Sequence, residues 1–151
     1  MDEPHRAEIP DSERDAFLGI GGTGVISFPA EADQSPHSVP ISYGYDAEEA
    51  TFYFRMATGR ESEKDEVVGR SVTFVTYGHD EESDRWWSVV AKGRLDRVDS
   101  EDISSQTLRG LERVDIPLVD VFDVPVRDIS FEFVRLVPEE LTARKELRAD
   151  I

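Results

Sequence analysis

The residues best suited to chemistry in this chain form a basic cluster. Arg55, Arg60 and Lys64 lie within ten residues of one another in a protein whose net charge is −16, and Lys64 is one of only three lysines. Ser62 opens a stretch, residues 62–68, that we expect to form a turn of helix. A forked guanidinium, an ammonium, a hydroxyl and the amide groups of a helix start together suit a phosphate monoester. Equally, these residues could form a surface patch of ion pairs with the four interleaved acidic side chains.

The strand that we expect at His37–Tyr45 has two unlike faces. One face carries bulky residues typical of a barrel core, and the other carries only small ones: Ser38, Pro40, Ser42 and Gly44. Proline cannot donate to a ladder, so Pro40 indicates a sheet edge or a gap between strands. A face without bulk leaves room for a flat ligand against the backbone, although a plain edge strand would explain the same pattern.

Two adjacent tryptophans, Trp86 and Trp87, fall in another expected strand. Neighbouring residues of a strand point to opposite faces, so one ring can fill the core while the other lies at an interface or beside a ligand. We expect Trp87 to be the one that faces a ligand.

Other motifs carry little functional signal. The segment Gly19–Gly24 matches the G-x-G-x-x-G dinucleotide pattern, but a helical segment precedes it and a strand follows, which is the reverse of what that motif requires. The three histidines lack ligand spacing, and we expect no metal site: His5, His37 and His79.

Composition narrows the class of protein. There is no cysteine for disulfides or thiolate chemistry, no apolar run long enough for a membrane helix, and a polar N-terminal segment unlike a signal peptide. We therefore expect a cytoplasmic protein without a membrane partner. Acidic residues number 33 against 17 basic ones, which disfavours a nucleic-acid partner. A high-salt cytoplasm would favour such a halophilic surface, and an ordinary acidic mesophile is the alternative.

The order of the elements predicts a mainly β fold. Six strands are expected, with two or three short helices and tight connections, which is typical of an antiparallel barrel with appended helices. The helices are expected at Asp11–Leu18, capped by Asp11 or Ser12, and across residues 99–114, capped by Ser100. The strands are expected at Gly22–Phe28, His37–Tyr45, Thr51–Met56, Ser71–Tyr77, Arg85–Val98 and 128–137. We divide the chain into a flexible acidic arm (1–10), a barrel domain (11–141) and a charged tail (142–151).

In the order and spacing of these segments the chain resembles the pyridoxamine 5′-phosphate oxidase-like family of FMN-binding split barrels, in its small flavin-nucleotide-binding branch. The segments that carry the resemblance are DAFLGIGGTGVISF, SVPISYGYD, FYFRMATGRESEK, SVTFVTY, WWSVVAKGRLDRV and FEFVRLVPEELTARK. The resemblance implies a six-stranded antiparallel split barrel, a homodimer, and FMN held across the subunit interface.

The resemblance also implies particular flavin contacts. The phosphate would be held by Arg55, Ser62 and Lys64, whereas the role of Arg60 is open because it is separated from Lys64 by ESE. The backbone of Met56 and Ala57 would lie beside the ribityl chain and the ring. The isoalloxazine would lie against Pro40, Ile41 and Ser42, and Trp87 and Ser88 would approach from a neighbouring strand or the other subunit.

We therefore expect an FMN-dependent oxidoreductase of unknown substrate, with the cofactor carrying the chemistry. The C-terminal arginine–histidine elements that hold pyridoxamine phosphate in true oxidases of that substrate are not apparent, so that activity is not expected. The alternatives are a flavin carrier or sensor without turnover, the same fold with a deazaflavin or haem, and an interaction module without a cofactor. No catalytic acid or base is assigned.

The acidic composition predicts that low salt destabilises the protein. The Debye length grows from about 3 Å at 1 M salt to about 10 Å at 0.1 M, so repulsion among the carboxylates extends further across the surface. Thermal melts should show a lower Tm in tenth-molar than in molar salt. An unchanged Tm would contradict the halophilic interpretation.

Overall fold

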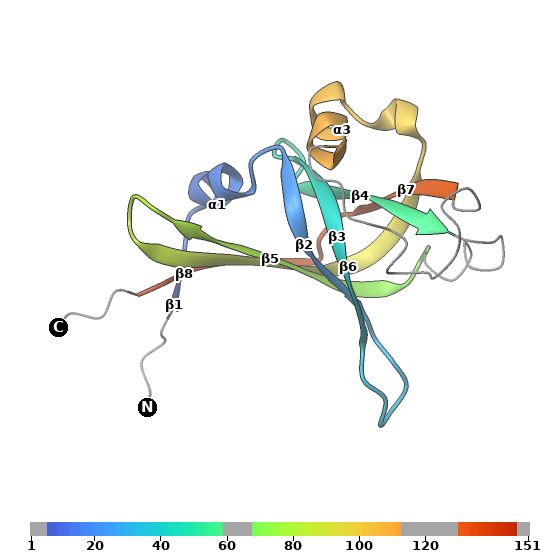
Figure 1. Ribbon diagram of the computed structural model, residues 1–151, viewed down its shortest axis with the longest axis horizontal. Coiled ribbons are helices and arrows are strands. Elements are labelled where there is room, and N and C mark those ends of the chain that lie inside the picture. The colour runs from blue at the N-terminus through green and yellow to red at the C-terminus, as the bar shows by residue number, and fades with distance from the viewer. Residues whose placement is uncertain (1–5, 59–67, 113–129, 148–151) are drawn as a thin grey trace.

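The computed structural model describes residues 6–58, 68–112 and 130–147 of the chain. Along the chain these residues form strand β1 (Arg6–Glu8), helix α1 (Asp11–Leu18), strands β2 (Gly21–Phe28), β3 (His37–Asp46), β4 (Thr51–Thr58), β5 (Ser71–Asp80) and β6 (Arg85–Val98), a 3-10 turn η1 (Ser100–Asp102), helix α3 (Ser105–Glu112), and strands β7 (Ser130–Leu136) and β8 (Glu140–Glu146) (Figure 1). None of the helices described has the length and hydropathy needed to cross a membrane.

Six of these strands close into a ring, in the order β2-β3-β4-β7-β6-β5, with every neighbouring pair antiparallel. Closure depends on β6, whose long edge serves two partners in turn. Residues 87–92 of β6 pair with β8, and residues 95–98 pair with β7. The expected six-stranded antiparallel split barrel is confirmed, and the segment of β6 beside β8 extends from it as a wing.

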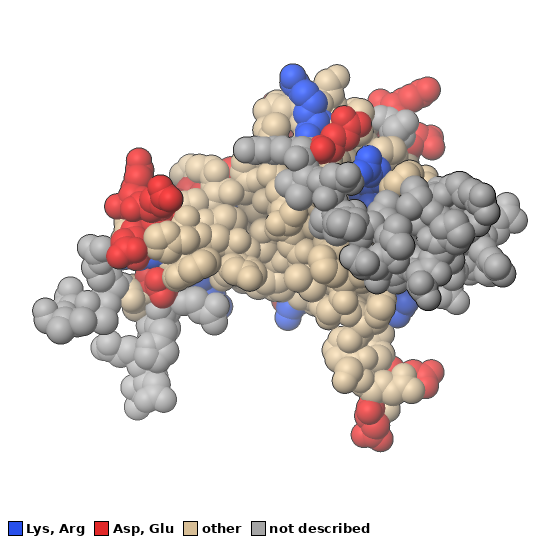
Figure 2. Space-filling view, viewed as in Figure 1, with Lys and Arg blue, Asp and Glu red and all other residues tan. Residues whose placement is uncertain are grey.

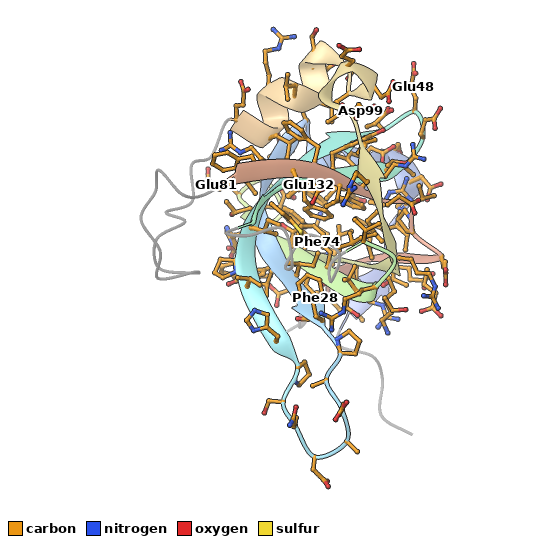
Figure 3. The ribbon with its side chains drawn as sticks, turned by 90° about the vertical axis from the view of Figure 1, so that its right-hand side faces the viewer. Phe28, Glu48, Phe74, Glu81, Asp99 and Glu132 are labelled. Carbon is orange, nitrogen blue, oxygen red and sulfur yellow. The ribbon has the colours of Figure 1, made fainter. Side chains whose placement is uncertain are left out.

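Aromatic side chains from alternate strand positions fill the ring. Phe52, Phe54 and Phe74 are completely buried, and Phe74 lies at the centre of the barrel (Figure 3). Its ring meets those of Tyr43 and Phe54 edge-on, with centroids 5.3 and 4.9 Å apart. Burial of each phenylalanine contributes roughly 1.5–3 kcal/mol, so this cluster is a main source of the barrel's stability.

Two helix details differ from the sequence-based expectation. Helix α1 has the predicted bounds, but its N-cap is Pro10, which makes no side-chain capping bond, so neither Asp11 nor Ser12 is the cap. The pattern across residues 99–114 is not one helix, because η1 and α3 are separate. The Ser104 hydroxyl accepts the Thr107 N–H at 3.2 Å and starts α3, so the prediction of Ser100 as the cap was wrong.

Both ends of the described chain contribute strands. Residues 6–8, which we assigned to a flexible arm, pair with β8, and residues 142–146, which we assigned to a tail, form most of β8. β8 pairs in turn with β6. The charged sequence of this segment hides its strand character, because Ala143 is the one fully buried residue of β8 and the alternation of apolar and polar residues is weak. The expected boundary at residue 141 therefore falls inside a strand.

Helix α3 packs closely on the outer side of β2 and β3 at glycine positions. A Cβ on Gly44 would collide with the carbonyl group of Thr107, and a Cβ on Gly110 would collide with that of Ile20. Beside this contact a second apolar cluster joins Tyr53 to Ile103 and Leu111. The glycines allow the helix to approach the sheet backbone and cover this end of the barrel.

We predict that Gly110→Ala destabilises the protein by about 1–3 kcal/mol, the usual cost of overpacking. Alanine has the higher helix propensity by about 1 kcal/mol, so the expected sign is opposite to that in an exposed helix. Thermal unfolding should be compared with Gln106→Ala, an exposed position of the same helix. A gain in stability for Gly110→Ala would contradict the close approach of α3 to Ile20.

Candidate functional site

Strands β3 and β4 pair over only part of their length. The ladder joins Tyr43–Asp46 to Thr51–Phe54. Before Tyr43, β3 pairs with β2 alone, and after Phe54, β4 pairs with β7 alone. Figure 1 shows β3 running down into the projecting β2–β3 hairpin while β4 turns away from it. Between them is a split, at which the facing edges of both strands have no ladder partner within the described ranges.

Six of the ten predicted cofactor-binding residues flank this split. Continuing the register past the last pair, Tyr43 with Phe54, places three pairs of residues opposite one another across the split: Ser42 and Arg55, Ile41 and Met56, Pro40 and Ala57. The tertiary structure therefore brings together two segments that the sequence analysis selected separately.

The residues of the split divide between its inner and outer sides. Ile41 belongs to the buried core and Met56 packs against that core, so both side chains point into the barrel. Pro40 is exposed on the outer side. The β2–β3 ladder continues on both sides of Pro40, so the missing donor faces the split. β3 is consequently not an edge strand of the sheet, and Pro40 lies beside a gap.

Arg55 presents a cation on the outer side of the split. Its guanidinium carbon lies 4.8 Å from the ring centroid of Phe131, on the neighbouring strand β7. Among the described residues no carboxylate oxygen lies within 4 Å of its nitrogens, whereas Arg97 pairs with Glu132. A half-buried arginine that has no carboxylate partner in this part of the chain is suited to an anionic ligand.

The rest of the predicted phosphate corner lies outside the described residues. This applies to Arg60, Ser62 and Lys64 and to residues 62–67 of the helical turn expected at 62–68. Their role stays a prediction from the sequence.

A separate hollow opens on the outer face of the wing. It has a volume of about 610 Å³ and is lined by Val75, Tyr77, Trp86, Trp87, Ser88, Glu146 and Leu147. The sequence analysis selected two of these residues, Trp87 and Ser88. It missed Tyr77 and Glu146, because their proximity to the tryptophans depends on the pairing of β6 with both β5 and β8.

The two tryptophans have different roles in this hollow. Trp86 is 52% exposed, and its backbone N–H donates to Glu146 Oε1 at 2.9 Å. The ring of Trp87 stacks on Phe17 of α1, with centroids 5.1 Å apart and planes 2° from parallel. We expected Trp87 to be the ring on the ligand-facing side, but Trp86 is the more exposed of the two.

A charged network holds α1 behind Trp87. Lys145 Nζ donates to Glu13 at 3.1 Å, lies 3.2 Å from Asp80, and sits 5.5 Å from the ring centroid of Phe17. This one ammonium therefore links α1, the β5–β6 hairpin and β8. No local sequence pattern would reveal the network, because its members come from three distant segments.

The pKa values in this region follow from these contacts. The hydrogen bond to Glu13 raises the pKa of the Lys145 ammonium, and the hydrogen bond from Ser83 lowers the pKa of the Asp80 carboxyl. Burial raises the pKa of Tyr45, whose hydroxyl donates to Asp15 at 2.6 Å. These groups keep their ordinary charges at neutral pH, so the network is a structural support for α1.

The split and the hollow lie apart on one face of the sheet. Pro40, Val25, Val75 and Val90 are directly opposite one another across three successive ladders. At the usual strand spacing this places β3 about 14 Å from β6. Within one chain, Trp87 and Ser88 therefore do not join the residues of the split in a single pocket.

Comparisons with known proteins agree on the fold. Residues 10–145 match the sequence model of a family described as pyridoxamine 5′-phosphate oxidase, which confirms the resemblance inferred from the sequence. A comparison with curated proteins gives no match.

Solved structures of similar fold include three that bind FAD. The FAD-binding protein from Mycobacterium smegmatis is 22% identical, with 92% of this chain and 97% of that chain covered and a TM-score of 0.58. A FAD-binding protein from Mesorhizobium loti is 19% identical, with 95% and 98% covered and a TM-score of 0.61. A FAD- and haem-binding protein from Mycobacterium smegmatis is 9% identical, with 98% and 77% covered and a TM-score of 0.63. At these identities the likeness establishes a shared fold.

Proposed function

The chain belongs to the pyridoxamine 5′-phosphate oxidase family, and on this premise we propose that it binds a flavin nucleotide at the split between β3 and β4. The observation that carries the proposal is the split itself: two strand edges that have no ladder partner among the described residues, with Arg55, which has no carboxylate partner among those residues, at their side. A flat polar ring needs backbone donors and acceptors along its edge, and a phosphate needs a cation. The FAD ligands of the similar folds support a flavin rather than another planar ligand.

In this proposal the parts of FMN map onto the strands in order. Arg55 binds the phosphate together with Ser62 and Lys64. The backbone of Met56 and Ala57 runs beside the ribityl chain, and the isoalloxazine lies along Pro40, Ile41 and Ser42. The small outer side chains of β3 would let the ring approach the backbone. Pro40 has no N–H, so the strand presents no backbone donor at that position.

We further propose that the protein is an FMN-dependent oxidoreductase, since the bound flavin would supply electron transfer while the chain supplies position and electrostatics. A flavin carrier without turnover is the main alternative. Reduction of the bound flavin by NAD(P)H followed by reoxidation with an added acceptor distinguishes the two. The absorbance spectrum of the purified protein, with and without added FMN, separates both from a haem or deazaflavin protein and from a colourless interaction module.

A homodimer is part of the same proposal. The outer face of β3, β2, β5 and β6 as far as Lys92 carries no acidic side chain at the positions that ladder pairing places on it: Ser38, Pro40, Ser42, Thr23, Val25, Ser27, Thr73, Val75, Tyr77, His79, Trp86, Ser88, Val90 and Lys92. Its basic residues, Lys92 opposite Thr73 and His79 opposite Trp86, lie toward the two ends of the β5–β6 ladder, and Ser42 is buried. In Figure 2 charged side chains gather at the periphery, and the middle of the view, over β2, β3 and β5, is largely uncharged. In a chain of net charge −16 such a face suits a second copy.

The dimer would also complete the site. Because β3 and β6 are about 14 Å apart within one chain, the β6 residues of the hollow could approach a flavin only from the other subunit. Ser88 and the exposed Trp86 share the outer face, whereas the Trp87 ring points to the opposite face, toward Phe17. A two-fold arrangement of these faces, which lack acidic side chains, would set the hollow of one subunit toward the split of its partner.

We predict that Tyr77→Glu dissociates the dimer. Tyr77 is 67% exposed in the single chain, so the substitution should leave the fold intact while placing a charge within the apolar contact. Light scattering in molar salt should report about twice the monomer mass of 17.1 kDa for the parent protein and the monomer mass for the variant. Val137→Glu, at a site of similar exposure away from this face, is the control. A parent protein that is monomeric at working concentrations would contradict the proposal.

We predict that the phosphate corner discriminates FMN from riboflavin. A charge-assisted hydrogen bond contributes roughly 1.5–3 kcal/mol, so Arg55→Ala and Lys64→Ala should each weaken FMN binding by about 10- to 100-fold. Riboflavin has no phosphate, so its affinity should hardly change, and Arg60→Ala should have the smallest effect on FMN. Fluorescence titration of both flavins measures this. Equal losses for FMN and riboflavin would place these residues outside the phosphate site.

A further inference from the structure

The hollow on the wing is bordered by two exposed aromatic rings. Tyr77 is 67% exposed and Trp86 is 52% exposed, and their ring centroids lie 6.1 Å apart with the planes 45° from parallel. The ring of His79 meets Trp86 edge-on at 5.2 Å, and its Nε2 lies 3.0 Å from Asp84 Oδ1. This contact supports the indole from the β5 side. Two tilted π-faces therefore share one hollow and remain accessible in the single chain.

A carboxylate lies beside these rings. Glu146 Oε1 accepts the Trp86 backbone N–H at 2.9 Å, and this bond fixes the carboxylate next to the indole. Arg6 is the ladder partner of Glu146 on β1. A carboxylate offers about four acceptor positions, so it can bind more than one donor at a time. Among the described residues that line the hollow, Glu146 is the charged one.

The surroundings of the hollow favour a cation over an anion. The loop between β5 and β6 carries Glu81, Glu82 and Asp84, and acidic side chains gather at this end of the wing in Figure 2. Arg144 is opposite Ser88 in the β6–β8 ladder, but it does not line the hollow. In a chain of net charge −16 this potential disfavours an anionic occupant such as a phosphate ester.

We propose that the hollow binds a small organic ammonium ion, with its alkylated nitrogen against Trp86 and Tyr77 and its charge beside Glu146. A cation within about 6 Å of an aromatic face is attracted by the ring quadrupole, most strongly by that of tryptophan. The alkyl groups would contact the apolar part of the lining, Val75 and Leu147, and the volume of about 610 Å³ suits a small molecule. The described part of the chain has no group of three or more metal-ligating side chains, which disfavours a metal ion as the occupant.

The residues of this site come from β5, β6 and β8 of a single chain, so the site does not require a flavin. In the proposed dimer the hollow would open toward the split of the partner. An organic ammonium ion would then be the class of substrate that reaches the flavin. This second step alone rests on the proposed function.

The experiment compares choline with 3,3-dimethylbutan-1-ol, which has the same shape but carries a carbon atom in place of the charged nitrogen. Each is titrated into the flavin-free, full-length protein at constant molar ionic strength. The chain has two tryptophans, so NMR resolves two indole N–H signals, and the signal missing from Trp86→Leu belongs to Trp86. Choline should bind about 10-fold more tightly than the alcohol and should shift the Trp86 signal more than the Trp87 signal.

Two substitutions and a matched control locate the site. Glu146→Gln removes the charge but keeps an acceptor for the Trp86 N–H, and Trp86→Leu keeps an apolar side chain but removes the π-face. Each should weaken choline binding by about 5-fold and change the affinity for the alcohol little. Glu140→Gln, an exposed position opposite Lys92 at the other end of β8, makes the same change in net charge and should alter neither affinity.

Three results would overturn the proposal. Equal affinities for choline and the alcohol would show that the hollow does not select a cation. Equal effects of Glu146→Gln and Glu140→Gln would show that choline responds only to net charge. Unchanged choline affinity in Trp86→Leu would place the bound cation elsewhere. Failure to bind FMN is a separate result, because these titrations contain no flavin, and it would overturn only the second step.

Discussion

The β3–β4 ladder stops after four residue pairs, and the arrangement of the possible binding surfaces depends on this interruption. A fully paired ring would satisfy every backbone group internally and offer a ligand only side chains. Here Pro40 withholds a donor on the side facing β4, β3 continues outward with β2, and β4 continues with β7. The edges that result have no ladder partner among the described residues, and their backbone groups can bond to water or to a ligand. The same interruption aligns Arg55 with Ser42, and Phe131 lies on β7, across β4 from the opening.

Closure of the ring elsewhere compensates for this opening. β6 pairs with β5 along one edge and with β8 and then β7 along the other, so it connects the wing to the barrel in one continuous strand. The buried rings of Phe52, Phe54 and Phe74 fill the space that closure encloses. Helix α3 then covers the end of the barrel at glycine positions, where side chains would keep it away. The split can remain open because the core around it does not depend on its hydrogen bonds.

The acidic side chains are distributed unevenly over the surface. Carboxylates dominate the chain, yet the outer positions of β3, β2, β5 and the start of β6 carry none. Desolvating an unpaired carboxylate at a contact is costly, so an acidic protein keeps its acidic residues away from faces that it buries. In the wing, two carboxylates are instead paired with one cation: Lys145 joins Glu13 and Asp80 and supports the Phe17–Trp87 stack. The aromatic wall of the hollow is therefore backed by α1 through the Phe17–Trp87 stack.

The sequence by itself determined the barrel class, its six ring strands and the segments of the possible site. Period-two alternation is local, so His37–Tyr45 and Ser71–Tyr77 could be recognised as strands with a core face, and the small residues around Pro40 could be recognised as unusual. The tertiary structure alone decided which of these segments meet. The register of β3 against β4 places Pro40, Ile41 and Ser42 across from Arg55, Met56 and Ala57, and pairing in a sheet joins residues without any local signal. For the same reason the strand character of residues 6–8 and 142–146, the exposure of Trp86 rather than Trp87, and the contact of Arg55 with Phe131 could not be predicted from composition or spacing.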